Sequence, residues 1–243
     1  MDTPKILQAG DSAVIVEFGC EISYKLNALV HALDKAVKAK NIQGVVETVP
    51  TFRSLEVVYD PCIISGNKLE LKLIKLCKTI TAHEVLQKRI IEIPVLYGGS
   101  YGEDLADVAA HTGLSEQEVI KLHSETDYLI YMLGFLPGFA YLGGMDSRLN
   151  TPRLQNPRTK IHAGAVGIGG EQTGIYPLAS PGGWRLIGTT PVRPYDPRRE
   201  APILYSGGEY IRFKSISEDE FKEIEKQVSN GTYECKVTGG DAL

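Results

Sequence analysis

The density of glycine and proline in the second half of the chain constrains the fold more than any other feature of the sequence. Residues 134–208 hold 14 of the 25 glycines and 9 of the 13 prolines. Glycine weakens a helix interior and proline breaks one, so this stretch cannot be helical. Apolar residues recur there at strand-like spacing between Ile161 and Ile187. We therefore predict short strands and tight turns, in a β-barrel or a closely related β architecture.

The first part of the chain differs, because segments with helical spacing alternate with short β-rich runs. Two helices on one face of an antiparallel sheet would bury both of their apolar stripes. The chain would then form a small α+β domain followed by a mainly-β domain. The expected helices cover 22–37 and 69–80, the strands 13–18, 44–49 and 55–59, and the two domains residues 1–88 and 89–243.

Residues between and after these segments carry clear helix signals. Ser115 to Glu118 has the spacing of a capping box, in which a serine and a glutamate satisfy the first amides of a helix. Gly113 can close the preceding helix. A second capping box over 217–220 opens a last helix that should reach residue 228, and 127–133 is expected to be a strand.

Charge and composition exclude several function classes. The formal net charge is -4, so a polyanion such as DNA would be repelled and no nucleic-acid partner is expected. No apolar run is long enough to cross a bilayer, and the first residues lack the basic and apolar regions of a signal peptide. We therefore expect a cytoplasmic protein with no membrane partner.

The glycine-rich stretch is locally basic within this acidic chain. Residues 134–200 contain eight Lys and Arg against four Asp and Glu, a net charge of +4. Such a face would attract a small anion, unless the arginines are scattered over solvated turns. Exposed amides in its glycine turns could hold an oxyanion, or the glycines could simply shape tight hairpins.

Several familiar sites are missing from the sequence. It has no G-x-x-x-x-G-K-[ST] phosphate loop, no H-E-x-x-H motif and no cysteine–histidine cluster, so we expect no metal site. His162 alone among the histidines lies in the glycine-rich stretch. His123 lies near the end of an expected helix, where a cation would complement the helix dipole.

Several long motifs resemble the family of 5-oxoprolinase B subunits, which is also called KipI or allophanate hydrolase subunit 1. The resemblance covers nearly the whole chain. The segment 134–144 is similar to the family's G-F-x-P-G-F-x-Y-L signature. The other similar segments are Thr151-Pro152-Arg153, Asn156-Pro157-Arg158, Gly170 to Pro177, and Ser180 to Trp184.

This resemblance implies a fold, an activity and partners. The fold would be an α+β N-terminal domain followed by a cyclophilin-like β-barrel. The activity would be the ATP-dependent opening of 5-oxo-L-proline to L-glutamate, with the chain inactive or weakly active alone. The 5-oxoprolinase C subunit would contact the chain directly, the A subunit would complete the complex, and ATP would be bound by or shared with a partner.

The same resemblance suggests roles for particular residues. Arginines would contact anions, Gln172 and Thr173 would hydrogen-bond an amide, and Tyr176 and Trp184 would wall the pocket. The candidate catalytic residues are Arg153, Arg158, Gln172 and Thr173; the candidate substrate-binding residues are Phe135, Pro137, Phe139, Tyr176, Ser180, Trp184 and Arg185.

Several departures from the family pattern leave the substrate open. Thr189 lies where an arginine is common, and His162 and Ala165 lie in a segment that commonly reads P-A-G-S. Pro194-Tyr195 replaces the usual L-F before Asp196-Pro197. Two other functions therefore stay open: a carboxyltransferase-type or allophanate hydrolase-type subunit, or a KipI-type inhibitor of a sporulation histidine kinase. In an inhibitor, the apolar segment 135–141 could be a docking patch, although a core strand and turn would have the same composition.

Overall fold

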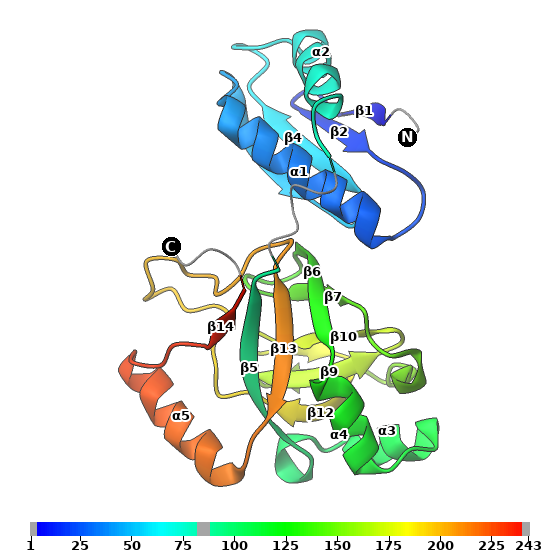
Figure 1. Cartoon of the computed structure of the whole chain (residues 1–243), viewed down its shortest axis with the longest axis vertical. Coiled ribbons are helices and arrows are strands. Elements are labelled where there is room, and N and C mark those ends of the chain that lie inside the picture. Colours follow the sequence, from blue (N-terminus) through cyan, green and yellow to red (C-terminus); the bar gives the residue numbers. More distant parts are fainter. Residues whose placement is uncertain (1–3, 82–87, 240–243) are drawn as a thin grey trace. The chain divides into compact units, whose positions relative to one another are not determined.

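The chain forms two compact units, and the computed structural model describes residues 4–81 and 88–239 (Figure 1). The units are Met1–Gln87 and Lys88–Leu243, and the division that we expected after residue 88 falls beside this boundary. Within the described residues, no helix combines the length and the apolarity needed to cross a membrane.

The first unit is an antiparallel sheet with two helices. Its four strands lie in the order β1-β2-β4-β3. Apolar residues of both helices, such as Leu33 and Leu73, are fully buried with sheet residues such as Leu55. The elements are β1 (Lys5–Ala9), β2 (Ala13–Glu17), α1 (Tyr24–Lys40), β3 (Val45–Pro50), β4 (Ser54–Tyr59) and α2 (Gly66–Cys77).

Strand β1 was absent from our sequence-based prediction. Its side chains are exposed or half-buried, and Leu7 leaves 46% of its surface exposed to solvent. The strand therefore lacks the apolar alternation that marks a half-buried strand in sequence. Its backbone pairs with β2 from Lys5 to Ala9 and extends the sheet at one edge.

The second unit contains a barrel-like sheet, which confirms the predicted mainly-β architecture. The strand order is β10-β9-β12-β5-β13-β6-β7, and β7 also lies against β10, so the ends of the order meet. Figure 1 shows β5 and β13 side by side, and this pair is parallel. The barrel strands are β5 (Ile90–Tyr97), β6 (Asp127–Leu133), β7 (Ala140–Gly143), β9 (Ala165–Gly169), β10 (Gln172–Ile175), β12 (Arg185–Thr189) and β13 (Tyr210–Ser215).

Short elements complete this unit outside the barrel path. Strands β8 and β11 pair with each other, and β14 adds to β5. The 3-10 turns η2 and η3 lie in connections. These elements are η2 (Gly99–Tyr101), α3 (Leu105–Thr112), α4 (Glu116–Ser124), η3 (Ser147–Leu149), β8 (Arg158–Ile161), β11 (Ser180–Gly182), α5 (Glu218–Asn230) and β14 (Val237–Thr238).

The predicted starts of α4 and α5 and the predicted end of α3 are confirmed, whereas α5 runs to Asn230, two residues beyond the predicted end. Ser115 and Glu118 form a complete capping box at α4, and Ser217 and Glu220 form another at α5. Gly113 closes α3 in the left-handed conformation, with φ 73°. These local signals depend only on residues within one turn of the helix end, which is why the sequence alone reveals them.

Candidate functional site

Five of the predicted site residues meet at one small cavity of the second unit. The cavity has a volume of about 160 Å³. Its walls come from the segment after β6, the segment before β8, and the stretch from β10 to β12. The lining residues are Phe135, Phe139, Tyr141, Arg153, Tyr176, Pro181, Gly182, Gly183 and Trp184. We call it the aromatic pocket.

Buried aromatic rings form the base of the aromatic pocket. Phe139 lies 5.3, 5.9 and 5.7 Å, between ring centroids, from Tyr141, Tyr176 and Trp184. All three contacts are edge-on, the geometry that the ring quadrupoles favour. Phe139, Tyr176 and Trp184 expose 3%, 3% and 6% of their surfaces. The rings therefore support one another and form a rigid apolar base.

The glycines of this region provide the space that Trp184 occupies. A Cβ atom on Gly169 would lie 2.3 Å from Cδ1 of Trp184. A Cβ atom on Gly182 would lie 2.4 Å from the Tyr176 hydroxyl. Both distances are far below van der Waals contact, so a side chain at either position would displace an aromatic ring. Close packing of protein against protein thus explains these two glycines.

Arg153 supplies the positive charge of the aromatic pocket. Its guanidinium carbon lies 5.9 Å from the centroid of the Trp184 ring, within the range of a cation–π contact. Arg153 forms no ion pair with any residue of the described chain. Its donors are therefore available to a ligand anion, and a guanidinium can bind a carboxylate in a bidentate manner.

Phe135 and Pro137 lie at the exposed edge of the same segment. Phe135 keeps 65% of its surface exposed and has a φ of 66°, which is rare for a residue with a side chain. Its ring contacts Phe139 edge-on at 5.5 Å. The segment 135–141 is therefore mixed: Phe135 and Pro137 are exposed, whereas Phe139 belongs to the core.

Two predicted anion-binding arginines already have carboxylate partners, which corrects our interpretation of the basic stretch. Arg158 lies 2.9 Å from Asp104 and 3.2 Å from Glu103. Arg185 lies 2.8 Å from Asp107. The pKa of Arg158 is raised, chiefly by its hydrogen bond to Asp104. These acids come from outside residues 134–200, so the local excess of positive charge is largely neutralised in the fold.

The buried acid Asp104 has a structural role. It exposes 5% of its surface, and its second oxygen accepts the backbone N–H of Leu186 at 2.7 Å. One carboxylate therefore binds Arg158 and holds β12 in place. Arg158 also donates to the carbonyl of Trp184 at 3.5 Å, which places it behind the aromatic pocket.

The remaining three predicted residues lie outside the aromatic pocket. Thr173 is fully buried, and its hydroxyl donates to the carbonyl of Gly167, so it is not positioned to bind a substrate amide as we expected. Gln172 is half-buried in β10 and does not line the cavity. Ser180 is buried, and its hydroxyl has no hydrogen-bond partner within the described chain.

His123 has an arrangement that the sequence did not predict. Nε2 lies 2.7 Å from the Thr173 hydroxyl, and Nδ1 lies 2.7 Å from the Tyr97 hydroxyl. Thr173 gives its only proton to Gly167, so Nε2 of His123 must be the donor to Thr173. Nδ1 is then unprotonated and accepts from Tyr97. Burial lowers the pKa of His123 to about 3, so it is neutral and not the helix-end cation that we expected.

Two of the residues that depart from the family pattern, His162 and Thr189, contact each other. Nε2 of His162 lies 3.0 Å from the Thr189 hydroxyl, which donates to the carbonyl of Tyr101 at 2.7 Å. Both residues line a groove of about 870 Å³ beside α5. This groove shares no lining residue with the aromatic pocket. These two departures therefore lie away from the predicted site residues that meet at the aromatic pocket.

Curated relatives cover almost the entire chain. It is 41% identical over 234 residues to the 5-oxoprolinase B subunit of Bacillus subtilis (strain 168), in a match that covers 92% of this chain and 97% of that protein. It is 42% identical to the 5-oxoprolinase B subunit of Escherichia coli O157:H7, over 84% of this chain and 92% of that protein. Urea amidolyase of Saccharomyces cerevisiae is 27% identical, over 97% of this chain and 14% of that protein.

Solved structures have the same fold, in chains of different length. A protein named TTHA0988 is 39% identical with a TM-score of 0.76, over 84% of this chain and 40% of that longer chain. A conserved uncharacterised protein of Pyrococcus horikoshii is 47% identical with a TM-score of 0.54, over 89% of this chain and all of that one. Urea amidolyase of K. lactis shares the fold, with a TM-score of 0.77 and 22% identity. That match covers 98% of this chain and 16% of that one.

A family sequence model gives the same assignment. The model of the carboxyltransferase domain, subdomains C and D, matches residues 4–205. That range includes the whole aromatic pocket. The chain therefore belongs to the family of carboxyltransferase subdomain C and D proteins that includes the B subunits of 5-oxoprolinase.

Proposed function

We propose that this chain is the B subunit of an ATP-dependent 5-oxoprolinase that converts 5-oxo-L-proline to L-glutamate. The observation that carries the proposal is the guanidinium of Arg153 at the rim of a small cavity walled by aromatic rings. 5-Oxoproline combines a flat five-membered ring with a carboxylate. The ring suits the apolar base formed by Phe139, Tyr176 and Trp184, and the carboxylate suits the guanidinium.

The size of the aromatic pocket favours a site that a second polypeptide completes. Its 160 Å³ is below the roughly 300–1,000 Å³ that is usual for a small-molecule site. The exposed ring of Phe135 extends the apolar surface beyond the cavity. The longer chain of TTHA0988, of which the match covers 40%, provides a precedent for further polypeptide beside this one. We assign the opposite wall to the C subunit of the enzyme, and the A subunit would then complete the complex.

ATP is assigned to the companion polypeptides in this proposal. The sequence has no phosphate-binding loop, and the aromatic pocket is too small for a nucleoside triphosphate. When bound, ATP would activate the lactam carbonyl by phosphorylation. With ADP released, one water would add to the carbonyl carbon and the ring C–N bond would break, leaving the nitrogen as the amine of glutamate. A second water would then release the phosphoryl group as inorganic phosphate and complete the side-chain carboxylate. In this chain Arg153 would hold the substrate, while the aromatic rings exclude bulk water.

Kinetics of the reconstituted three-subunit complex test the proposal. Arg153→Ala should raise KM for 5-oxoproline, since a charge-assisted pair to a carboxylate contributes roughly 1.5–3 kcal/mol, or about 10- to 100-fold. Arg148→Ala is the matched control, because it removes the same charge from an exposed ion pair with Asp146 outside the pocket. Equal kinetics for both variants would remove Arg153 from the site.

Carboxyl transfer to a urea-like amide is the second candidate. The matching family model is that of a carboxyltransferase domain, and this observation favours it. A flat amide would suit the aromatic base, but a neutral amide such as urea gives Arg153 no carboxylate to bind. Assay of the same complex with 5-oxoproline and with urea separates the two functions. Turnover of urea alone would replace the first proposal with the second.

A further inference from the structure

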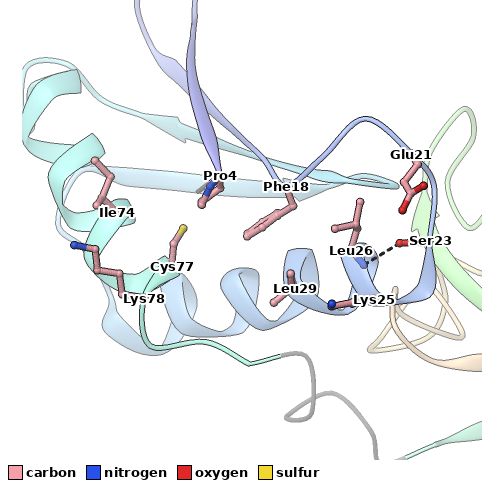
Figure 2. Close-up of a pocket in the computed structure, with 10 residues that line it drawn as sticks. All are labelled: Pro4, Phe18, Glu21, Ser23, Lys25, Leu26, Leu29, Ile74, Cys77 and Lys78. Atoms are coloured by element: carbon pink, nitrogen blue, oxygen red, sulfur yellow. Dashed lines mark hydrogen bonds between the residues drawn. The ribbon is translucent and has the colours of Figure 1, made fainter. Parts of the chain in front are cut away.

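The first unit contains a groove of its own, with a volume of about 520 Å³ (Figure 2). It lies between the N-terminal half of α1 and the C-terminal end of α2, at the ends of β1 and β2. Its volume is within the range of small-molecule sites. None of the residues predicted from sequence to bind substrate belongs to it, so the groove is independent of the function proposed above.

Apolar side chains form the floor of this groove. They are Phe18 from the segment after β2, Leu26 and Leu29 from α1, and Ile74 and Cys77 from α2. Figure 2 shows the Cys77 sulfur and the Phe18 ring facing the space between the two helices. Only Leu29 is buried, while the other four remain partly exposed. An apolar ligand would therefore remove further apolar surface from water.

The rim of the groove is mainly positive. Lys25 and Lys78 lie at its two ends in Figure 2, and neither forms an ion pair with a described residue. α1 begins here, directly after its N-cap Ser23, and its first turn contains no acidic residue to balance the positive end of the helix dipole. Among the described residues of the lining, Glu21 is the one carboxylate. The negative dipole end of α2, which ends at Cys77, offsets the positive end of α1. Two lysines against one glutamate still leave the rim with a net positive charge, which favours an anion.

We propose that this groove binds a small organic anion with an apolar body, of the medium-chain carboxylate class. The apolar body would cover the floor between α1 and α2. The carboxylate would lie at the rim, within reach of a lysine ammonium. This ligand class satisfies both features of the groove, whereas an inorganic anion would leave the floor exposed and an uncharged hydrocarbon would leave the lysines unpaired.

Thiol alkylation of the full chain, with octanoate as the probe, tests this inference. Octanoate should slow the alkylation of Cys77 in a saturable way. Cys235 is the matched control, since it is also half-buried and burial raises the pKa of both thiols, to about 11 and about 12. The exposed Cys20 and Cys62 report any direct effect on the reagent. Equal slowing of all four thiols, or of none, would overturn the inference.

Variants and ligand analogues then separate the two parts of the recognition. Replacing both Lys25 and Lys78 by alanine should weaken octanoate binding roughly two- to fivefold, as is typical for one exposed charge pair. Lys72→Ala, on the exposed side of α2, should leave it unchanged. Acetate, which has no apolar body, should give no protection. Unaltered octanoate protection in the double lysine variant would refute the role of the rim.

Discussion

The buried histidine His123 makes the stability of the barrel unit depend on pH in a predictable direction. Its folded-state pKa is lowered by burial to about 3, whereas an unfolded histidine titrates near 6.5. Between these values the unfolded chain binds a proton that the folded chain does not bind. Stability is therefore fully present above pH 6.5 and is lost as the pH falls toward 3.

The size of this effect follows from the two pKa values. Linkage predicts that the free energy of unfolding decreases by about 2 kcal/mol between pH 7 and pH 5 because of His123 alone. Carboxylates titrate mainly below this window. His123→Gln would remove the titration while keeping an acceptor for Tyr97 and a donor for Thr173. This variant should lose about 2 kcal/mol less than the wild type over the same pH range.

Urea unfolding followed by tryptophan fluorescence measures this loss of stability in the barrel unit itself. The chain has one tryptophan, Trp184, and it lies in the barrel unit. His111→Gln is the matched control, because His111 is an exposed histidine of the same unit. It should keep the wild-type dependence on pH. If His123→Gln also keeps that dependence, the buried neutral histidine is not its cause and the reasoning fails.

Three further substitutions test the packing around the aromatic pocket and the helix start that was predicted from sequence. Gly169→Ala should displace Trp184, lowering stability by about 1–3 kcal/mol and shifting the fluorescence emission; an unchanged emission spectrum would contradict the packing argument. Asp104→Ala leaves Arg158 without its closest partner and should cost roughly 3 kcal/mol in urea unfolding, whereas a loss below about 1 kcal/mol would show that the pair is unimportant. Ser217→Ala removes a helix cap and should cost about 1 kcal/mol, measured in the same way, and no loss would refute the cap.

The sequence predicted those features that depend on neighbouring residues. Both capping boxes, the glycine at the end of α3 and the strand over 127–133 are present as expected. The glycine-rich composition also predicted the barrel correctly. In each case the signal lies within a few residues of the element that it specifies.

Features that depend on distant residues were not predictable in the same way. The partner of Arg158 is Asp104, 54 residues away, so the charge of a short stretch gave a misleading net value. His123 and Thr173 are 50 residues apart. Burial makes His123 a neutral ring in place of the expected helix-end cation, and it makes Thr173 part of the core in place of the expected substrate contact. Only the tertiary fold brings such pairs together.

A structure of the assembled complex with 5-oxo-L-proline bound would test the central claim most directly. We predict that the lactam ring lies against Phe139, Tyr176 and Trp184, with its carboxylate paired to Arg153 and the companion polypeptide closing the open side. Substrate bound at another place, with the aromatic pocket filled only by side chains of this protein or its partner, would contradict the account.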